Sequence, residues 1–103
     1  MAYRVELTVP AQRDREEIVS YLAVDLASPQ AARGFLEEFD RKVEMASGMP
    51  GSFPLCRQGD LANRGYRRAL VGNYLFIYAT DRRRKVVTIL RVFHGMQDYA
   101  RLL

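Results

Sequence analysis

The residues best equipped for chemistry in this sequence stand where an apolar stretch ends near the C-terminus. The segment RVFHGMQDYARLL, residues 91–103, carries Arg91, the only histidine of the chain (His94) directly before Gly95, and Tyr99. Histidine exchanges a proton readily near neutral pH, so His94 could serve as a general acid or base. A hydrogen-bonded structural histidine is the alternative. The residues alone leave open a reactive groove, a binding edge or the plain end of a strand.

A second group of candidates is strongly basic. The net charge is −3 over residues 1–50 and +7 over residues 51–103, and most cations are arginine, which suits bidentate recognition of phosphate or carboxylate. The cations between residues 57 and 91 are Arg57, Arg64, Arg67, Arg68, Arg82, Arg83, Arg84, Lys85 and Arg91. Interleaved tyrosines could stack on unpaired bases, or could be half-buried sheet residues. We therefore predict a nucleic-acid or target-binding surface, with an ordinary solvated basic surface as the alternative.

Arg91 stands apart because of its neighbours. In VVTILRVFH it alternates in phase with Val87, Ile89 and Phe93. An arginine in line with apolar neighbours is costly unless it meets an anion or an acidic partner, or reaches solvent along its stem.

The sequence lacks the motifs that several kinds of chemistry require. The sequence has no phosphate-binding glycine loop, no Cys/His spacing for a metal and no Ser or Cys nucleophile with a partner histidine. We expect no metal and no cofactor. The single Cys56 cannot form an internal disulfide, which fits a reducing cytoplasm, and no apolar run approaches the ~20 residues of a membrane span. No apolar signal region opens the sequence, so we expect a cytoplasmic protein without a membrane partner.

The elements that must position these residues follow from hydrophobic periodicity. Residues 3–9 alternate as a strand, and Pro10 ends it. Residues 11–27 and the stretch after Ser28-Pro29 have apolar positions at helical spacing and form a helical hairpin. Residues 48–60, rich in Gly and Pro, are a loop.

The remaining chain alternates with a period of two. It predicts strands at 65–71, 74–80 and 86–94, with a hairpin turn at Gly72-Asn73 and a basic turn at 81–85. The result is a single α+β domain, residues 1–103, of order βααβββ. Its N-terminal helical hairpin packs on one face of a mainly antiparallel four-stranded sheet, and the other face is free for function.

The whole pattern resembles the RelE/ParE superfamily, the toxins of bacterial type II toxin–antitoxin modules. The resemblance is carried by YRVELTVPAQRDREEIVSYL, SPQAARGFLEEF, GYRRALVGNYLFIYATD and ILRVFHGMQDYARLL. It implies the same βααβββ fold and a growth-arresting toxin neutralised by a cognate acidic antitoxin. A homodimer or a toxin–antitoxin hetero-oligomer is the expected assembly.

Two activities are known on this fold. RelE-like toxins cleave mRNA on the ribosome without a metal, and ParE-like toxins inhibit DNA gyrase. By resemblance, Arg67 and Tyr99 match basic and aromatic positions of the nuclease site, with His94 as a further catalytic candidate. Those nucleases generally carry an arginine where this chain has Leu75, and a histidine at the strand end also occurs in ParE-type members. The match therefore favours the ParE-like reading, with the ribosome-dependent nuclease as the alternative.

A third hypothesis is a non-toxic basic nucleic-acid-binding module. It is the least favoured, because both helices have acidic outer faces and cannot serve as a recognition helix. The acids in question are Asp14, Glu16, Glu17, Glu37, Glu38 and Asp40.

Overall fold

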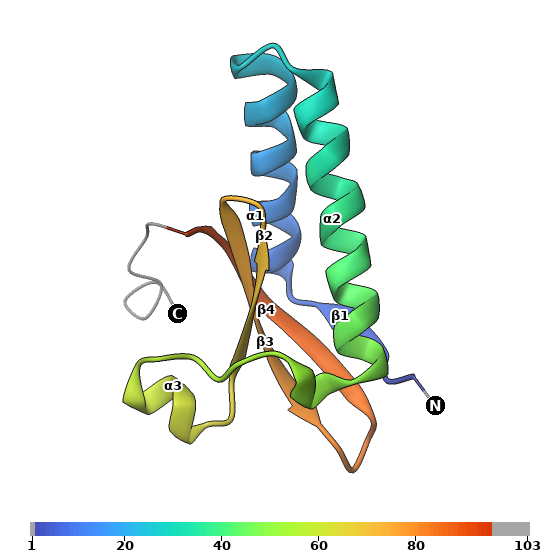
Figure 1. Ribbon diagram of the computed structural model, residues 1–103, viewed down its shortest axis with the longest axis vertical. Coiled ribbons are helices and arrows are strands. Elements are labelled where there is room, and N and C mark those ends of the chain that lie inside the picture. Colours follow the sequence, from blue (N-terminus) through green and yellow to red (C-terminus); the bar gives the residue numbers. More distant parts are fainter. Residues whose placement is uncertain (1, 96–103) are drawn as a thin grey trace.

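The computed structural model describes residues 2–95, which form one four-stranded sheet with a long helical hairpin on one face (Figure 1). In chain order the elements are β1 (Arg4–Leu7), α1 (Val9–Ser20), the π-helical turn η1 (Tyr21–Asp25), α2 (Pro29–Gly48), the 3-10 turn η2 (Pro50–Ser52), α3 (Gly59–Asn63), β2 (Arg67–Val71), β3 (Tyr74–Asp81) and β4 (Val86–His94). The sheet order is β1-β4-β3-β2, with β1 parallel to β4 and the other pairs antiparallel. The α+β architecture and the mainly antiparallel sheet are confirmed.

The first strand is shorter than predicted, because Thr8 starts a helix there. The Thr8 hydroxyl accepts a hydrogen bond from the Ala11 N–H at 3.1 Å and donates one to the Leu90 carbonyl at 2.7 Å. Pro10 then lies in the first turn of α1, where its missing N–H leaves no bond unmade. Val9, predicted as the last strand residue, is instead an exposed residue of α1.

The helical hairpin is formed as predicted, and its tip extends beyond the sheet in Figure 1. Ser28 caps α2 by accepting a hydrogen bond from the Ala31 N–H at 3.2 Å, and Pro29 follows at the first helical position. Ala27 makes the tight reversal between the helices with a positive φ of 48°.

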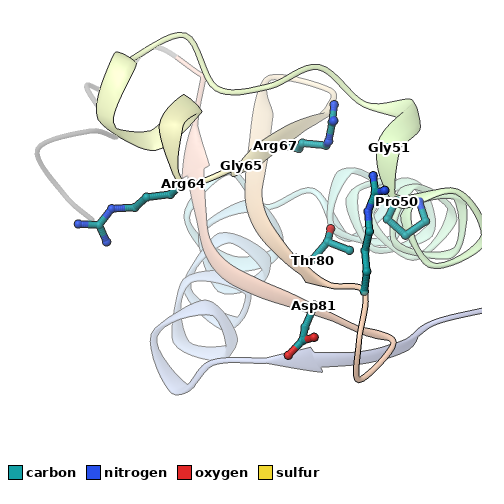
Figure 2. A pocket seen from close by; sticks show the side chains of 8 residues that line it. Pro50, Gly51, Arg64, Gly65, Arg67, Thr80 and Asp81 are labelled. Atoms are coloured by element: carbon teal, nitrogen blue, oxygen red, sulfur yellow. The ribbon is translucent and has the colours of Figure 1, made fainter.

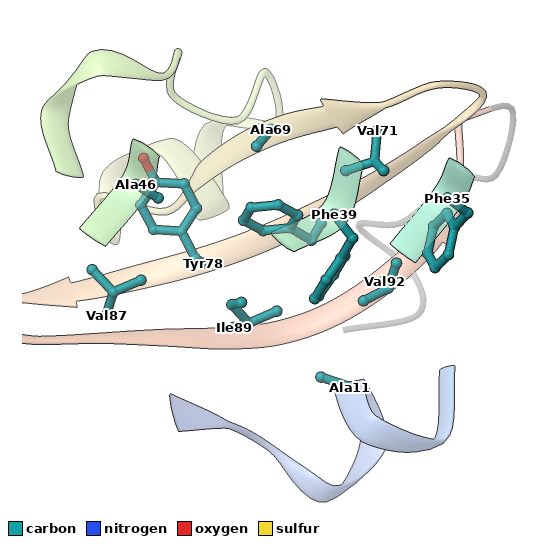
Figure 3. Close-up of a cluster of buried hydrophobic side chains, with 11 residues drawn as sticks. Ala11, Phe35, Phe39, Ala46, Ala69, Val71, Tyr78, Val87, Ile89 and Val92 are labelled. Atoms are coloured by element: carbon teal, nitrogen blue, oxygen red, sulfur yellow. The ribbon is translucent and has the colours of Figure 1, made fainter. Parts of the chain in front are cut away.

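The main core lies between α2 and the sheet (Figure 3). Phe39 packs edge-on against Phe76, with ring centroids 5.4 Å apart, and Phe35 packs in the same way against Tyr74 at 5.3 Å. Edge-to-face rings at these separations contribute roughly 0.5–1.5 kcal/mol each beyond the burial of their area. Tyr78, Val87 and Ile89 complete the sheet side of this core.

The opposite face of the sheet is not free, and the prediction of an uncovered face is wrong. Residues 53–66, which include α3, fold across it and enclose a second apolar cluster. Its buried members are Cys56, Leu61, Leu75, Ile77 and Phe93. The same segment covers the outer edge of β2: the Arg68 N–H donates to the Pro54 carbonyl at 3.0 Å, and Leu55 bridges to Arg67.

A β-bulge in β4 changes which side chains face the helices. Ile77 of β3 is paired with Arg91, but Tyr78 is paired with Ile89, so Leu90 is an extra residue. As a result Val92, not Arg91, joins Val87 and Ile89 in the main core, while Phe93 joins the second cluster. The predicted phase for Arg91 and Phe93 is therefore wrong, because simple alternation does not continue through a bulge.

Candidate functional site

Arg91 lies just beyond the point where β1 ends, and an acid of α1 takes the place of that strand. Its Nε and Nη2 atoms donate to the two carboxylate oxygens of Asp14 at 2.7 and 3.0 Å. Asp14 Oδ2 also accepts the Val92 N–H at 2.9 Å, which no residue of β1 reaches. The acidic partner that Arg91 requires is thus supplied by the chain itself. Hydrogen bonding to Asp14 raises the pKa of the Arg91 guanidinium.

A different group of arginines surrounds an open pocket where β2 begins and β3 ends (Figure 2). The pocket has a volume of about 540 Å³. It is lined by Pro50, Gly51, Arg64, Gly65, Arg67, Thr80, Asp81 and Arg82. We call it the Arg67–Arg82 pocket. It lies beyond the C-terminal end of α2, where the turn η2 meets the sheet.

Two hydrogen bonds hold the walls of this pocket. The Tyr78 hydroxyl donates to the Pro50 carbonyl at 2.5 Å, and Arg67 Nη1 donates to the Phe53 carbonyl at 2.6 Å. Burial raises the pKa of Tyr78 to about 12, although the nearby charge of Arg67 acts in the opposite direction. Tyr78 is fully buried, so it fixes the position of η2 relative to β3.

The other predicted cations are spread over different parts of the surface. Arg83, Arg84 and Lys85 are exposed in the turn between β3 and β4, next to the pocket. Asp81 begins that turn, and its Oδ1 accepts the Arg84 N–H at 3.0 Å.

Arg57 and Arg64 lie in residues 53–66, the segment that covers the outer face of the sheet, and Arg68 lies in the adjacent strand β2. Arg57 is exposed, and Arg64 lies 3.6 Å from Asp60 in an exposed pair. Arg68 faces the side of the second cluster, where its charge acts on the pKa of Cys56 against the larger, raising effect of burial. The predicted basic surface is therefore several separate groups, of which the Arg67–Arg82 pocket is the one with a defined shape.

The three residues considered for catalysis are not gathered into one site. Arg67 is paired with Tyr78, whereas His94 is paired with Tyr74, four residues back along β3. At ~3.3 Å per strand residue this separates them by roughly 13 Å along the strand direction, and β3 lies between their two strands. His94 packs edge-on against the Tyr74 ring, with centroids 5.5 Å apart. Tyr99 lies outside the described residues.

Leu75, which stands where the nucleases carry an arginine, is an apolar residue in apolar surroundings. It is 4% exposed and packs in the second cluster with Ile77 and Phe93 beneath the covering segment. Among residues 2–95 no carboxylate is buried, so none of them could balance a cation inside that cluster.

Two residues of this region were missed from the sequence. Asp14 was assigned to an acidic outer face, although the need of Arg91 for an acid was a signal that some carboxylate must lie close. Tyr78 is one of the tyrosines predicted to stack on bases or to be half-buried in the sheet; its full burial and its hydrogen bond to Pro50 give no signal in a strand pattern.

Within residues 2–95, no cluster of three or more His, Cys, Asp or Glu side chains could hold a metal ion. In the same range, no helix is both long and apolar enough to cross a membrane.

Comparison with solved structures places this fold in the RelE/ParE class of toxins. The ParDE system of Pseudomonas aeruginosa matches with a TM-score of 0.70 and 16% identity, covering 90% of this chain and 96% of that one. The RelBE2 toxin–antitoxin complex of Mycobacterium tuberculosis matches with a TM-score of 0.60 and 26% identity, covering 91% and 99%. The archaeal RelE–RelB complex of Pyrococcus horikoshii matches with a TM-score of 0.56 and 23% identity, covering 94% and 99%.

A family model gives the more specific assignment. The model described as the ParE toxin of the type II toxin–antitoxin system parDE matches residues 5–99. The chain therefore belongs to the ParE toxin family within the RelE/ParE superfamily. A comparison with curated protein sequences finds no significant match.

Proposed function

We propose that this ParE-family toxin arrests growth in the cytoplasm by inhibiting DNA gyrase. The observation that carries the proposal is the match of the ParE toxin model to residues 5–99, nearly the whole chain. Two features of the structure support it over mRNA cleavage. Leu75 is buried among apolar residues, and Arg67 and His94 lie at opposite ends of the β2–β3–β4 region.

The RelE-like nuclease remains the second candidate because of one comparison. The RelBE2 complex has 26% identity to this chain over 91% of its length, and its toxin carries the RelE name. For this activity the candidate residues are Arg67, His94 and Tyr99, acting on an RNA phosphate without a metal. Arg67 and His94 would need help from other groups, since they cannot contact one phosphate together.

Two parallel assays separate these candidates. The purified chain is added to gyrase supercoiling reactions and to cell-free translation programmed with ready-made mRNA, in which gyrase has no part. We expect loss of supercoiling with translation and message intact. Blocked translation with cut message would reject the gyrase proposal and establish the nuclease. The same chain premixed with its antitoxin is the control in both reactions.

We also propose that an acidic antitoxin neutralises the chain by binding along the helical hairpin and the basic second half. The structural neighbours are themselves toxin–antitoxin complexes. An apolar groove of about 350 Å³ runs between α1 and α2, lined in part by Val19, Ala23 and Leu36. Near it, at the hairpin tip, Val24 is 70% exposed. The apolar face of an amphipathic helix fits this groove, and acidic residues beyond that helix would suit the basic second half of the chain.

The test pairs two exposed valines. Val24→Asp is expected to weaken capture of the small acidic protein encoded beside the toxin, whereas Val9→Asp, at the other end of the hairpin, should leave it unchanged. Equal capture by both variants would remove the hairpin tip from the interface. The lack of any small acidic protein in the adjacent reading frame would reject the partner.

A further inference from the structure

We propose that the Arg67–Arg82 pocket binds a phosphate group, either from the backbone of a nucleic acid or as free phosphate. The pocket is separate from the hairpin groove and from the His94 end of the sheet. The inference does not depend on whether the toxin acts on gyrase or on the ribosome. It concerns the chemistry of two arginines, Arg67 and Arg82, that the fold brings to one pocket; Arg64 also lines it but lies 3.6 Å from Asp60.

The positive charges of Arg67 and Arg82 are not balanced by an acid of residues 2–95. Arg67 is partly buried, and the partner it has is a neutral one, the Phe53 carbonyl. Within residues 2–95, no carboxylate forms an ion pair with Arg67 or with Arg82. The partly buried guanidinium of Arg67 would gain stability from an anion that replaces its lost solvation. The exposed Arg82 lines the same pocket and can add a second charged contact to that anion.

The acid that lines the pocket does not fill this role. Asp81 Oδ1 accepts the Arg84 N–H within the β3–β4 turn. Figure 2 shows the Asp81 side chain directed away from Arg67. The carboxylate therefore shapes the turn and leaves the arginine side of the pocket positive.

The pocket also has room for a phosphate group and neutral polar groups in its wall. The volume of about 540 Å³ lies within the range of small-molecule sites, ~300–1,000 Å³, and admits a phosphate with its attached sugar. Thr80 adds a hydroxyl, and Gly51 adds no side chain to the wall beside Arg82. Gly65 has a φ of 79°, a conformation that side chains other than glycine rarely adopt, so the chain turns closely into β2.

The covered edge of β2 favours phosphate over an acidic peptide as the ligand of this pocket. A peptide that adds a strand needs an open sheet edge, but the edge of β2 beside this pocket is already covered by residues 54–56. In contrast, the neighbouring turn continues the positive charge with Arg83, Arg84 and Lys85. A pocket followed by a row of exposed cations suits a ligand whose negative charges repeat along a backbone.

The experiment uses the full chain and two probes, inorganic phosphate and a fluorescent 12-nucleotide single-stranded DNA. Arg82→Gln removes a pocket cation from an exposed turn, and Arg33→Gln removes an exposed cation from α2 as the charge-matched control. We expect Arg82→Gln to weaken DNA binding about tenfold, the usual worth of one charged hydrogen bond, and Arg33→Gln to change it by less than about twofold. The slope of log K against log salt should fall by ~0.7 in Arg82→Gln alone.

A second pair of variants tests the pocket without removing any arginine. Thr80→Glu places a carboxylate inside the pocket and should abolish binding of both probes, whereas Thr80→Gln, of equal size, should retain binding. Competition identifies the source of the phosphate: displacement of DNA by millimolar inorganic phosphate indicates a site for a single phosphate group, and its absence indicates a backbone site.

Three outcomes would overturn the proposal. Equal losses in Arg82→Gln and Arg33→Gln would show that binding depends on overall charge alone. Unchanged binding in Thr80→Glu would place the ligand elsewhere. Capture of an acidic peptide through Arg82, with neither phosphate probe bound, would make the pocket a protein-binding site. None of these results bears on supercoiling inhibition, so this inference and the proposed function can fail separately.

Discussion

Arg91 and Arg67 are both partly buried arginines on neighbouring parts of one sheet, yet they differ in the hydrogen-bond acceptors that surround them. Arg91 receives both oxygens of Asp14 at 2.7 and 3.0 Å, and its side chain is 28% exposed. Arg67 receives one backbone carbonyl and faces an open pocket. The difference indicates that Arg91 is part of the fold, whereas Arg67 is available to an anion from outside.

The cause lies in what each arginine meets along the chain. Beside Arg91, β1 ends and α1 begins, so a helical side chain can continue the role of a strand and satisfy the Val92 N–H as well. Beside Arg67, the neighbouring segment is the turn after α2, which offers carbonyl groups and a glycine. A helix start can present an acid to a sheet edge, but this turn cannot.

The strongest test of the comparison places a guanidinium where neither an acid nor solvent is available. Leu75→Arg, the residue found at this position in the nucleases, should cost about 4 kcal/mol of unfolding free energy, because the charge would be buried without a partner in the second cluster. Urea unfolding measures it, with Leu75→Met as the size-matched control, at less than about 1.5 kcal/mol. A stable Leu75→Arg protein would mean that the covering segment opens easily and that the outer face is accessible after all.

A smaller loss of unfolding free energy is expected when the ion pair between Arg91 and Asp14 is broken. Asp14→Ala leaves the Arg91 guanidinium and the Val92 N–H without their shared acceptor and should cost about 3 kcal/mol. Asp14→Asn keeps an oxygen for the N–H and should lose roughly half as much. Glu6→Ala, which breaks the exposed Arg4–Glu6 pair, is the control and should cost less than about 1 kcal/mol. If Asp14→Ala behaved like Glu6→Ala, Arg91 would be as open to a target as Arg67.

Much of this fold is predictable because its signals are local. The alternation of β2, β3 and β4, the Gly72-Asn73 turn and the Ser28-Pro29 helix start each lie within a few residues, and all three predictions are confirmed. α3 is not predictable in the same way, since its five residues follow a loop rich in Gly and Pro. The bulge at Leu90 is hidden for a related reason: an extra residue leaves no mark in a strand's composition.

The candidate site depends on contacts between distant residues, so less of it could be predicted. The need of Arg91 for an acid was visible, but its partner is 77 positions away on a helix whose acids all look solvent-facing. The pocket joins Arg67 and Arg82 to the turn at Pro50–Gly51, and only the folded sheet shows that these segments meet. The sequence points to the arginines as a set but gives no means of dividing them into those with an acidic partner and those without one in residues 2–95.

A third test concerns the buried hydroxyl that fixes the pocket wall. Tyr78 has its pKa raised from the ordinary value near 10 to about 12, so the fold favours its neutral form. This contribution to stability is complete below pH 10 and is lost as the pH rises from 10 toward 12, reaching about 2 kcal/mol near pH 11.5. Tyr78→Phe should be about 1 kcal/mol less stable than the wild type near pH 8, through loss of the Pro50 hydrogen bond, and should lack this alkaline loss. Identical alkaline slopes in the two proteins would assign the loss to other groups.

The smallest change in unfolding free energy is expected for a substitution of Arg67. Arg67→Gln removes a charge that no carboxylate of residues 2–95 pairs with, and it keeps a donor within reach of the Phe53 carbonyl, so the unfolding free energy should change by less than about 1 kcal/mol. Removal of a partner from the Arg91 pair is expected to cost several times more, although both arginines are partly buried strand residues. Added phosphate sharpens the contrast: it should raise the unfolding midpoint of the wild type and of Asp14→Asn, and leave that of Arg67→Gln unchanged. An equal rise in all three proteins would show that phosphate acts on the protein as a general salt, and Arg67 would then be as structural as Arg91.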